Sequence, residues 1–118
     1  MRIRSSRVRD WELVQVGELR APPGERPDLE AERVTEQLTT VLERVSLSRK
    51  DVCLTFAYVS SPESAAAFSE VASRAVPSDT AHVLPCPAMP ELDTRHIKVE
   101  LTAGRRLDPV STTESNNP

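Results

Sequence analysis

The sequence has few cysteines, few aromatic residues and no long apolar run, and each shortage excludes a class of protein. It holds two cysteines, Cys53 and Cys86, which excludes a disulfide scaffold and a four-cysteine zinc site. Aromatic residues make up 3% of the chain, too few for a platform on which nucleic-acid bases stack. The longest apolar run, Val52 to Val59, is far shorter than the ~20 residues that a transmembrane helix needs.

What is present indicates one small globular domain. The chain has 118 residues, 38% of them apolar and 28% charged, and a formal charge of −3 that argues against a basic nucleic-acid module. Its charged opening, residues 1–4, is followed by no apolar segment, so no secretory signal is predicted and a cytoplasmic location is expected. We expect a single domain over residues 1–105 and a disordered tail over 106–118, where Ser, Thr, Asn and Pro dominate.

The apolar pattern predicts five strands and two helices. Strands are expected at residues 2–8, 11–19, 52–59, 81–86 and 96–103, and helices at residues 28–45 and from residue 61 to before residue 77. Asp28 is the expected N-cap of the first helix, and Ser61 followed by Pro62 is a start signal for the second. The order is β-β-α-β-α-β-β, so the fold class is a two-layer α+β domain.

The strand over residues 52–59 is almost continuously apolar, which predicts a central strand covered on both of its faces. Cys53 lies inside this strand and is expected to belong to the core. The first strand, residues 2–8, carries charged side chains that suit an edge strand. Its arginines are interpreted as edge protection, and anion binding is the alternative.

Several stretches resemble the Rid family, the reactive intermediate deaminases, also called YjgF-like proteins. The resemblance rests on the end of the first helix with the strand that follows it (residues 41–59), the opening of the second helix (61–68) and the closing strand (97–103). Residues 11–17 are also similar to that family's second strand. The resemblance implies a YjgF-like (chorismate-mutase-like) fold and a homotrimer whose sheets form an inner barrel, with ligand clefts between subunits. A trimer would supply the second cover for residues 52–59.

Two family features are missing. Active members have an arginine just after the second helix that binds the substrate carboxylate, whereas the corresponding stretch here, residues 77–81, is Pro-Ser-Asp-Thr-Ala. The family's N-terminal Gly-Pro-Tyr-Ser segment is replaced by Arg-Ser-Ser-Arg at residues 4–7. The chain is therefore interpreted as a divergent member.

The resemblance places Glu100 at the position of a glutamate that orients water in hydrolytic members, and an ion pair with Lys98 is its alternative role. Cys86, between two prolines, is a candidate nucleophile and His82 a candidate partner for it. About 13 Å of extended strand would separate the two, so an inert thiol is the alternative. Arg95 could supply positive charge in place of the missing arginine, and a loop solvated by its charges is the alternative. Tyr58 could offer a hydroxyl at a subunit interface, and packing of the strand is its alternative role.

The leading hypothesis is a Rid-like homotrimer that binds a small metabolite in its clefts and acts on, or protects, a reactive imine- or enamine-type intermediate in a specialised biosynthetic pathway. The alternatives are an ordinary 2-iminobutanoate/enamine deaminase, which is a hydrolase, and a non-catalytic interaction protein. No phosphate loop or metal-ligand spacing occurs, so no cofactor or metal is expected, nor a nucleic-acid or membrane partner. The residues alone do not distinguish an enzyme from a binding protein.

Overall fold

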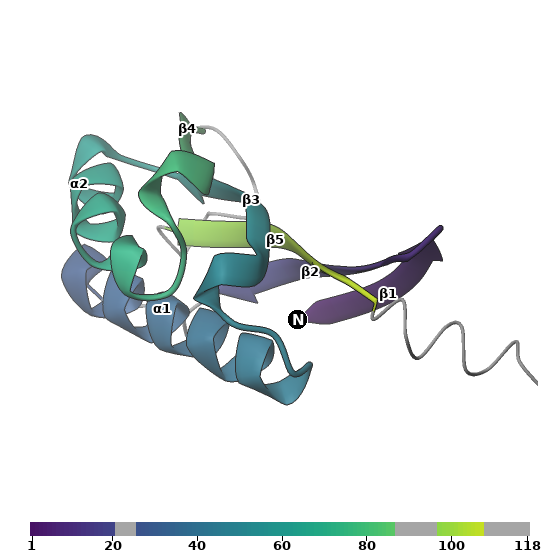
Figure 1. Cartoon of the computed structure of the whole chain (residues 1–118). Coiled ribbons are helices and arrows are strands. Elements are labelled where there is room, and N and C mark those ends of the chain that lie inside the picture. The colour runs from purple at the N-terminus through teal and green to yellow at the C-terminus, as the bar shows by residue number, and fades with distance from the viewer. Residues whose placement is uncertain (21–25, 87–96, 108–118) are drawn as a thin grey trace, which may run out of the picture.

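The chain forms one five-stranded β-sheet with two helices packed on a single face (Figure 1). The computed structural model describes residues 1–20, 26–86 and 97–107. The strands are β1 (Arg2–Val8), β2 (Trp11–Arg20), β3 (Val52–Val59), β4 (Ala81–Pro85) and β5 (Ile97–Arg106), and the helices are α1 (Pro27–Arg44) and α2 (Pro62–Val71). Short 3-10 turns occur at Arg49–Asp51, Ala72–Arg74 and Ser78–Thr80. The predicted α+β order is confirmed.

The last strand lies in the middle of the sheet. The strand order is β1-β2-β5-β3-β4, with β1 at one edge as predicted. Because β5 is antiparallel to both β2 and β3, those two strands run in the same direction, and α1 is the crossover between them. Strands β3 and β4 are parallel neighbours joined through α2. The order places β5 between the two halves of the sheet, where its outward side chains reach both.

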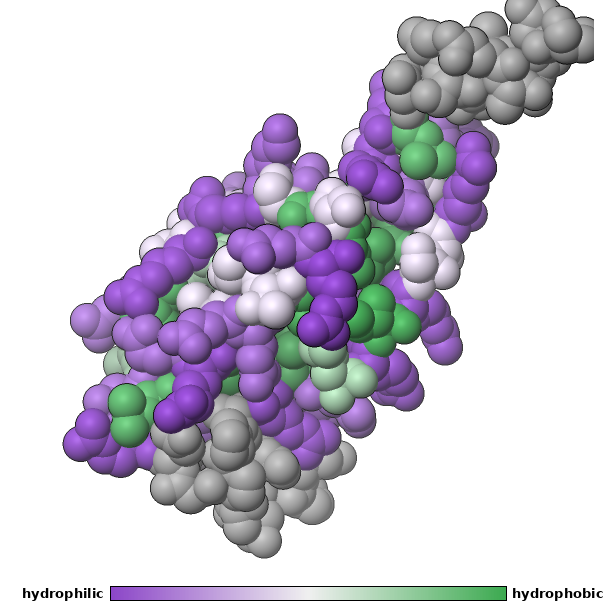
Figure 2. All heavy atoms as spheres, turned by 90° about the horizontal axis from the view of Figure 1, so that it is seen from below, coloured by the Kyte–Doolittle hydropathy of each residue, from purple (hydrophilic) through white to green (hydrophobic). Residues whose placement is uncertain are grey.

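One face of the sheet and the inner sides of the helices make the core. The strands contribute alternate residues such as Val16, Ala57 and Val99, and α2 contributes Phe68, which is fully buried. Figure 2 views the molecule from the side of α1 and shows mostly hydrophilic residues there, as expected for the outer surface of an amphipathic helix. The spacing of Val34 and Leu38 correctly predicted which side of α1 is buried.

The two helix starts differ from each other in how they are capped. The Ser61 hydroxyl accepts a hydrogen bond from the backbone N–H of Ser64 at 3.1 Å, so the predicted cap of α2 is confirmed. The prediction that Asp28 caps α1 is wrong: the helix begins at Pro27, and Arg26 is its N-cap without a side-chain hydrogen bond. Proline is favoured at the first helical position, which moves the start ahead of Asp28.

The expected burial of Cys53 is also wrong, and a β-bulge explains why. The pairing of β3 with β5 shifts register between Val52 and Leu54, so Cys53 leaves the alternation that its neighbours follow. Val52 is buried instead, and Cys53 is exposed. The prediction that both faces of β3 are covered fails in the single chain too, since Phe56 and Tyr58 are only half-buried.

The closing strand is longer than predicted, since it extends to Arg106 rather than residue 103. It therefore ends one residue beyond the expected domain boundary at 105. Of the expected tail, residues 108–118 lie outside the described part of the chain.

Candidate binding site on the open face of the sheet

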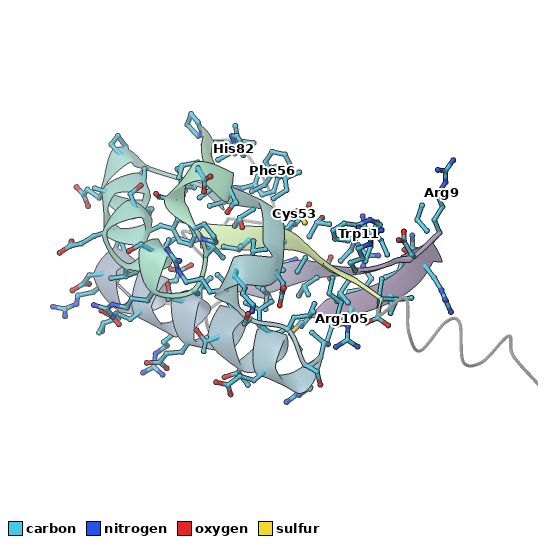
Figure 3. All side chains as sticks on the ribbon, viewed as in Figure 1. Arg9, Trp11, Cys53, Phe56, His82 and Arg105 are labelled. Atoms are coloured by element: carbon cyan, nitrogen blue, oxygen red, sulfur yellow. The ribbon has the colours of Figure 1, made fainter. Side chains whose placement is uncertain are left out.

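The sheet face opposite the two helices, called the open face below, gathers the polar and aromatic side chains of the strands. The strand registers place two rows of residues across it. One row is Arg4, Gln15, Thr102 and Leu54. The other is Glu100, Phe56 and His82, and the pair Arg2 and Gly17 lies beside it where the β2–β5 register shifts between Val16 and Leu19. In Figure 3, Phe56 and His82 lie side by side on the side of the sheet away from α1. Side chains from all five strands therefore meet on one surface.

A hollow of about 420 Å³ opens on this surface. Its charged lining residues are Arg2, Arg4 and Glu100, and its apolar walls include Leu54 and Phe56. This volume falls in the range of small-molecule sites, which are lined by apolar groups and a few polar ones. Glu100, which lines the hollow, is half-buried and comes from the central strand β5.

Glu100 belongs to a small electrostatic cluster. The Lys98 Nζ lies 4.0 Å from Glu100 Oε1 and 5.9 Å from the centre of the Tyr58 ring. Burial raises the pKa of the Tyr58 hydroxyl above its ordinary value, and electrostatic interaction with Glu100 and Cys86 raises that pKa further. Tyr58 is thus a protonated hydrogen-bond donor at neutral pH.

Three of the predicted site residues therefore interact electrostatically, since Glu100 and Cys86 both raise the pKa of Tyr58. His82 is not paired with Cys86. Its ring lies 5.6 Å from that of Phe56, its partner on the neighbouring strand, while the backbone N–H of Cys86 donates to the Val59 carbonyl oxygen at 2.8 Å. The fifth residue, Arg95, lies outside the described part of the chain.

The two arginines at the start of the chain have a placement that the edge-protection interpretation did not foresee. Arg2 and Arg4 alternate along β1 with Ile3 and Ser5, which lie on the face that carries the helices. Both arginines therefore point onto the open face and line the hollow. The signal was in the sequence, because residues two apart on a strand share a face. It could be interpreted only once the partner of each strand was known.

A buried carboxylate holds β5 in place. Glu30, fully buried in the first turn of α1, accepts a hydrogen bond from the backbone N–H of Ile97 at 2.8 Å. Ile97 begins the strand that carries Lys98 and Glu100, so this bond positions the cluster. The sequence held a hint of this role, since Glu30 precedes Val34 by four residues and therefore shares the buried side of α1.

In the part of the chain that the structure describes, no three His, Cys, Asp or Glu side chains are grouped so as to hold a metal ion. No described helix is long and apolar enough to span a membrane.

Solved structures with this arrangement come from YjgF-related proteins. A member of the YjgF protein family from Neisseria meningitidis superposes with a TM-score of 0.66 at 17% identity, covering 92% of this chain and 98% of its own. RidA from the Antarctic bacterium Psychrobacter sp. has a TM-score of 0.65 at 16% identity, covering 84% of each chain. A member of the YjgF/YER057c/UK114 family from Mycobacterium tuberculosis has a TM-score of 0.60 at 17% identity, covering 85% of this chain and 83% of its own.

The sequence matches no protein-family model and no curated protein. At identities below a fifth, these similarities concern the fold and not the chemistry. The match nevertheless extends over most of each chain. The chain therefore has the YjgF/Rid fold.

Proposed function

We propose that the chain assembles as a homotrimer and binds a small metabolite in clefts between subunits, where it acts on or protects a reactive imine- or enamine-type intermediate. The observation that carries this proposal is the hollow on the open face, with Glu100 in its lining. A second support is the apolar part of that face. Phe56, Tyr58 and Leu84 remain partly exposed in the single chain, as expected of a surface that a neighbouring subunit covers.

The proposed chemistry uses Glu100 as the base. Its carboxylate accepts a proton from a water molecule, whose oxygen adds to the imine carbon. The nitrogen takes up protons as the carbon–nitrogen bond breaks, so imine and water yield a carbonyl compound and ammonia. The protonated Tyr58 hydroxyl, close to Glu100, is placed to donate a hydrogen bond to the substrate or to the attacking water.

The test is a decay assay. An amino-acid oxidase generates an imino acid, and its loss is followed with and without the protein. We expect the native chain to accelerate the decay and the Glu100→Gln variant to lose most of that acceleration, on the order of 100-fold for a lost general base. Glu70→Gln, at an exposed position on α2, is the matched control and should keep full activity.

Two results would contradict the proposal. If the native chain does not change the decay rate, hydrolysis is excluded for that imine. Light scattering that finds a monomer at micromolar concentration would remove the inter-subunit cleft. Without acceleration, stable binding of an imine analogue by a trimer would favour protection of the intermediate over its hydrolysis.

A further inference from the structure

Arg2 and Arg4 have features of a ligand subsite rather than of a solvated edge. Both line the hollow, and within the described residues neither has a hydrogen bond or an ion pair. Two arginines of β5 are paired, by contrast: Arg105 lies 3.1 Å from Glu12, and Arg106 lies 2.9 Å from Asp10. The two guanidinium groups that line the hollow are thus unpaired in the part of the chain that the structure describes.

The Arg2 side chain lies against the backbone of β2. Its partner in the strand register is Gly17, and a Cβ atom on Gly17 would lie 4.0 Å from the Arg2 Nε. The guanidinium group therefore rests over the glycine, on the way to Glu100 in the next strand. Adjacent strands are ~4.8 Å apart, so β1 and β5 are separated by about 10 Å, a gap that a small ligand can fill.

The charges in the hollow are unbalanced. Glu100 is matched by Lys98, 4.0 Å away, which leaves the two arginines without a counter-charge among the described lining residues. Arg2, Arg4, Lys98 and Glu100 together carry a net charge of +2, whereas the whole chain has a formal charge of −3. Residues two apart on a strand are separated by about 6.6 Å, and long arginine side chains from such positions can converge on one oxyanion.

We infer that Arg2 and Arg4 form an anion subsite that binds the doubly charged end of the ligand, while its apolar body lies against Leu54 and Phe56. The chemical class is a small organic dianion, either a phosphomonoester or a dicarboxylate. This inference rests on the proposed metabolite-binding hollow and adds the charge of its ligand. The contacts would be charge-assisted hydrogen bonds, which guanidinium groups form readily with both kinds of oxyanion.

Calorimetric titration of the full chain with phenyl phosphate, isophthalate, benzoate and inorganic phosphate at pH 7.5 tests the subsite. We expect phenyl phosphate or isophthalate to bind at least about tenfold more tightly than benzoate, since the second charge adds a charge-assisted contact. The dianion that binds more tightly shows whether the subsite prefers a phosphomonoester or a dicarboxylate. Inorganic phosphate, without an apolar body, should bind more weakly than phenyl phosphate.

The variants separate a direct role from a general charge effect. Arg2→Gln and Arg4→Gln should each weaken dianion binding by about tenfold. Arg7→Gln is the matched control, because Arg7 lies on the same strand but pairs with Glu12 in the register of the opposite face. Gly17→Val should also weaken binding, because a larger side chain there displaces the Arg2 guanidinium while leaving its charge in place.

Three results would overturn the inference: no binding of either dianion to the native chain, equal loss in Arg7→Gln, or loss of binding together with a fall in mass by light scattering. The last would assign the arginines to assembly. Titration of Glu100→Gln distinguishes this inference from the proposed function. If that variant and the native chain bind the dianion equally while neither accelerates imine decay, the subsite stands and the catalytic proposal fails.

Discussion

The two faces of the β-sheet differ in how completely the chain covers them. On the helix face, Thr55, Ala57 and Val59 of β3 are buried under the helices. On the open face, the residues between them are half-buried and share the surface with charged groups from β1 and β5. The same strand thus contributes to a fully buried core on one side and to a partly exposed surface with charged groups on the other. Stability and function are expected to respond separately to changes on the two faces.

Truncation at the centre of the helix face should have the largest effect. Phe68 is fully buried where α2 packs against the sheet. Phe68→Ala is expected to lower the free energy of unfolding by about 3–5 kcal/mol, because it removes transfer free energy and leaves a cavity. Urea denaturation followed by circular dichroism measures the loss. A change below about 1 kcal/mol would mean that the helix layer is not the main core.

A charge at the centre of the open face should act on assembly instead. Phe56→Lys places a cation on the proposed subunit interface, and light scattering should then find a mass of about one third of the native value. Leu29→Lys is the control, since Leu29 is equally apolar, 41% exposed and on α1. An unchanged mass in Phe56→Lys would place the interface elsewhere.

Removing an unsatisfied polar group from the helix face should stabilise the chain. The Thr55 hydroxyl is fully buried and has no hydrogen-bond partner in the described part of the chain. Thr55→Val should raise the free energy of unfolding by about 1 kcal/mol, because it removes an unsatisfied polar group at nearly constant volume. Thr102→Val, at a half-buried position on the open face, should change it little. Equal effects in urea denaturation would erase the difference between the faces.

The smallest expected effect is the pH dependence that Tyr58 contributes. Its pKa is raised in the folded state, mainly by burial and then by Glu100 and Cys86. A raised folded pKa stabilises the fold below the unfolded pKa of about 10, and this contribution is lost as the pH rises through the folded value. Tyr58→Phe should therefore lose less stability than the native chain as the pH rises above about 10. If the melting temperatures of Tyr58→Phe and of the native chain fall equally at alkaline pH, Tyr58 is not the group responsible.

Local patterns were sufficient for the order of elements and for much of the core. The spacing of Val34 and Leu38 predicted the buried side of α1, and Ser61-Pro62 predicted the start of α2. These signals depend on interactions within a few residues, and local interactions can be inferred from the chain alone. Cys53 was misassigned because a bulge depends on how β3 pairs with β5, which no local pattern encodes.

For the candidate site, the sequence identified single residues but not their neighbours. Glu100 and Tyr58 were predicted site residues, and Glu100 raises the pKa of Tyr58, as Cys86 does. Arg2 and Arg4 were assigned to edge protection, because their approach to Glu100 depends on β5 lying next to β2. The His82 ring lies beside that of Phe56, at a tilt of 37°, and not against Cys86, since residues four apart on one strand are too distant for contact.

By itself, the sequence determined an α+β chain with few aromatic residues, two cysteines and an aliphatic core, because composition and periodicity act locally. The tertiary structure decided which of those residues share a surface. The few aromatic residues include Phe56 and Tyr58 on the open face, and one of the two cysteines, Cys53, lies exposed beside a bulge. The physical reason is the non-local pairing of β5 between β2 and β3, which joins residues from both ends of the chain into one hollow.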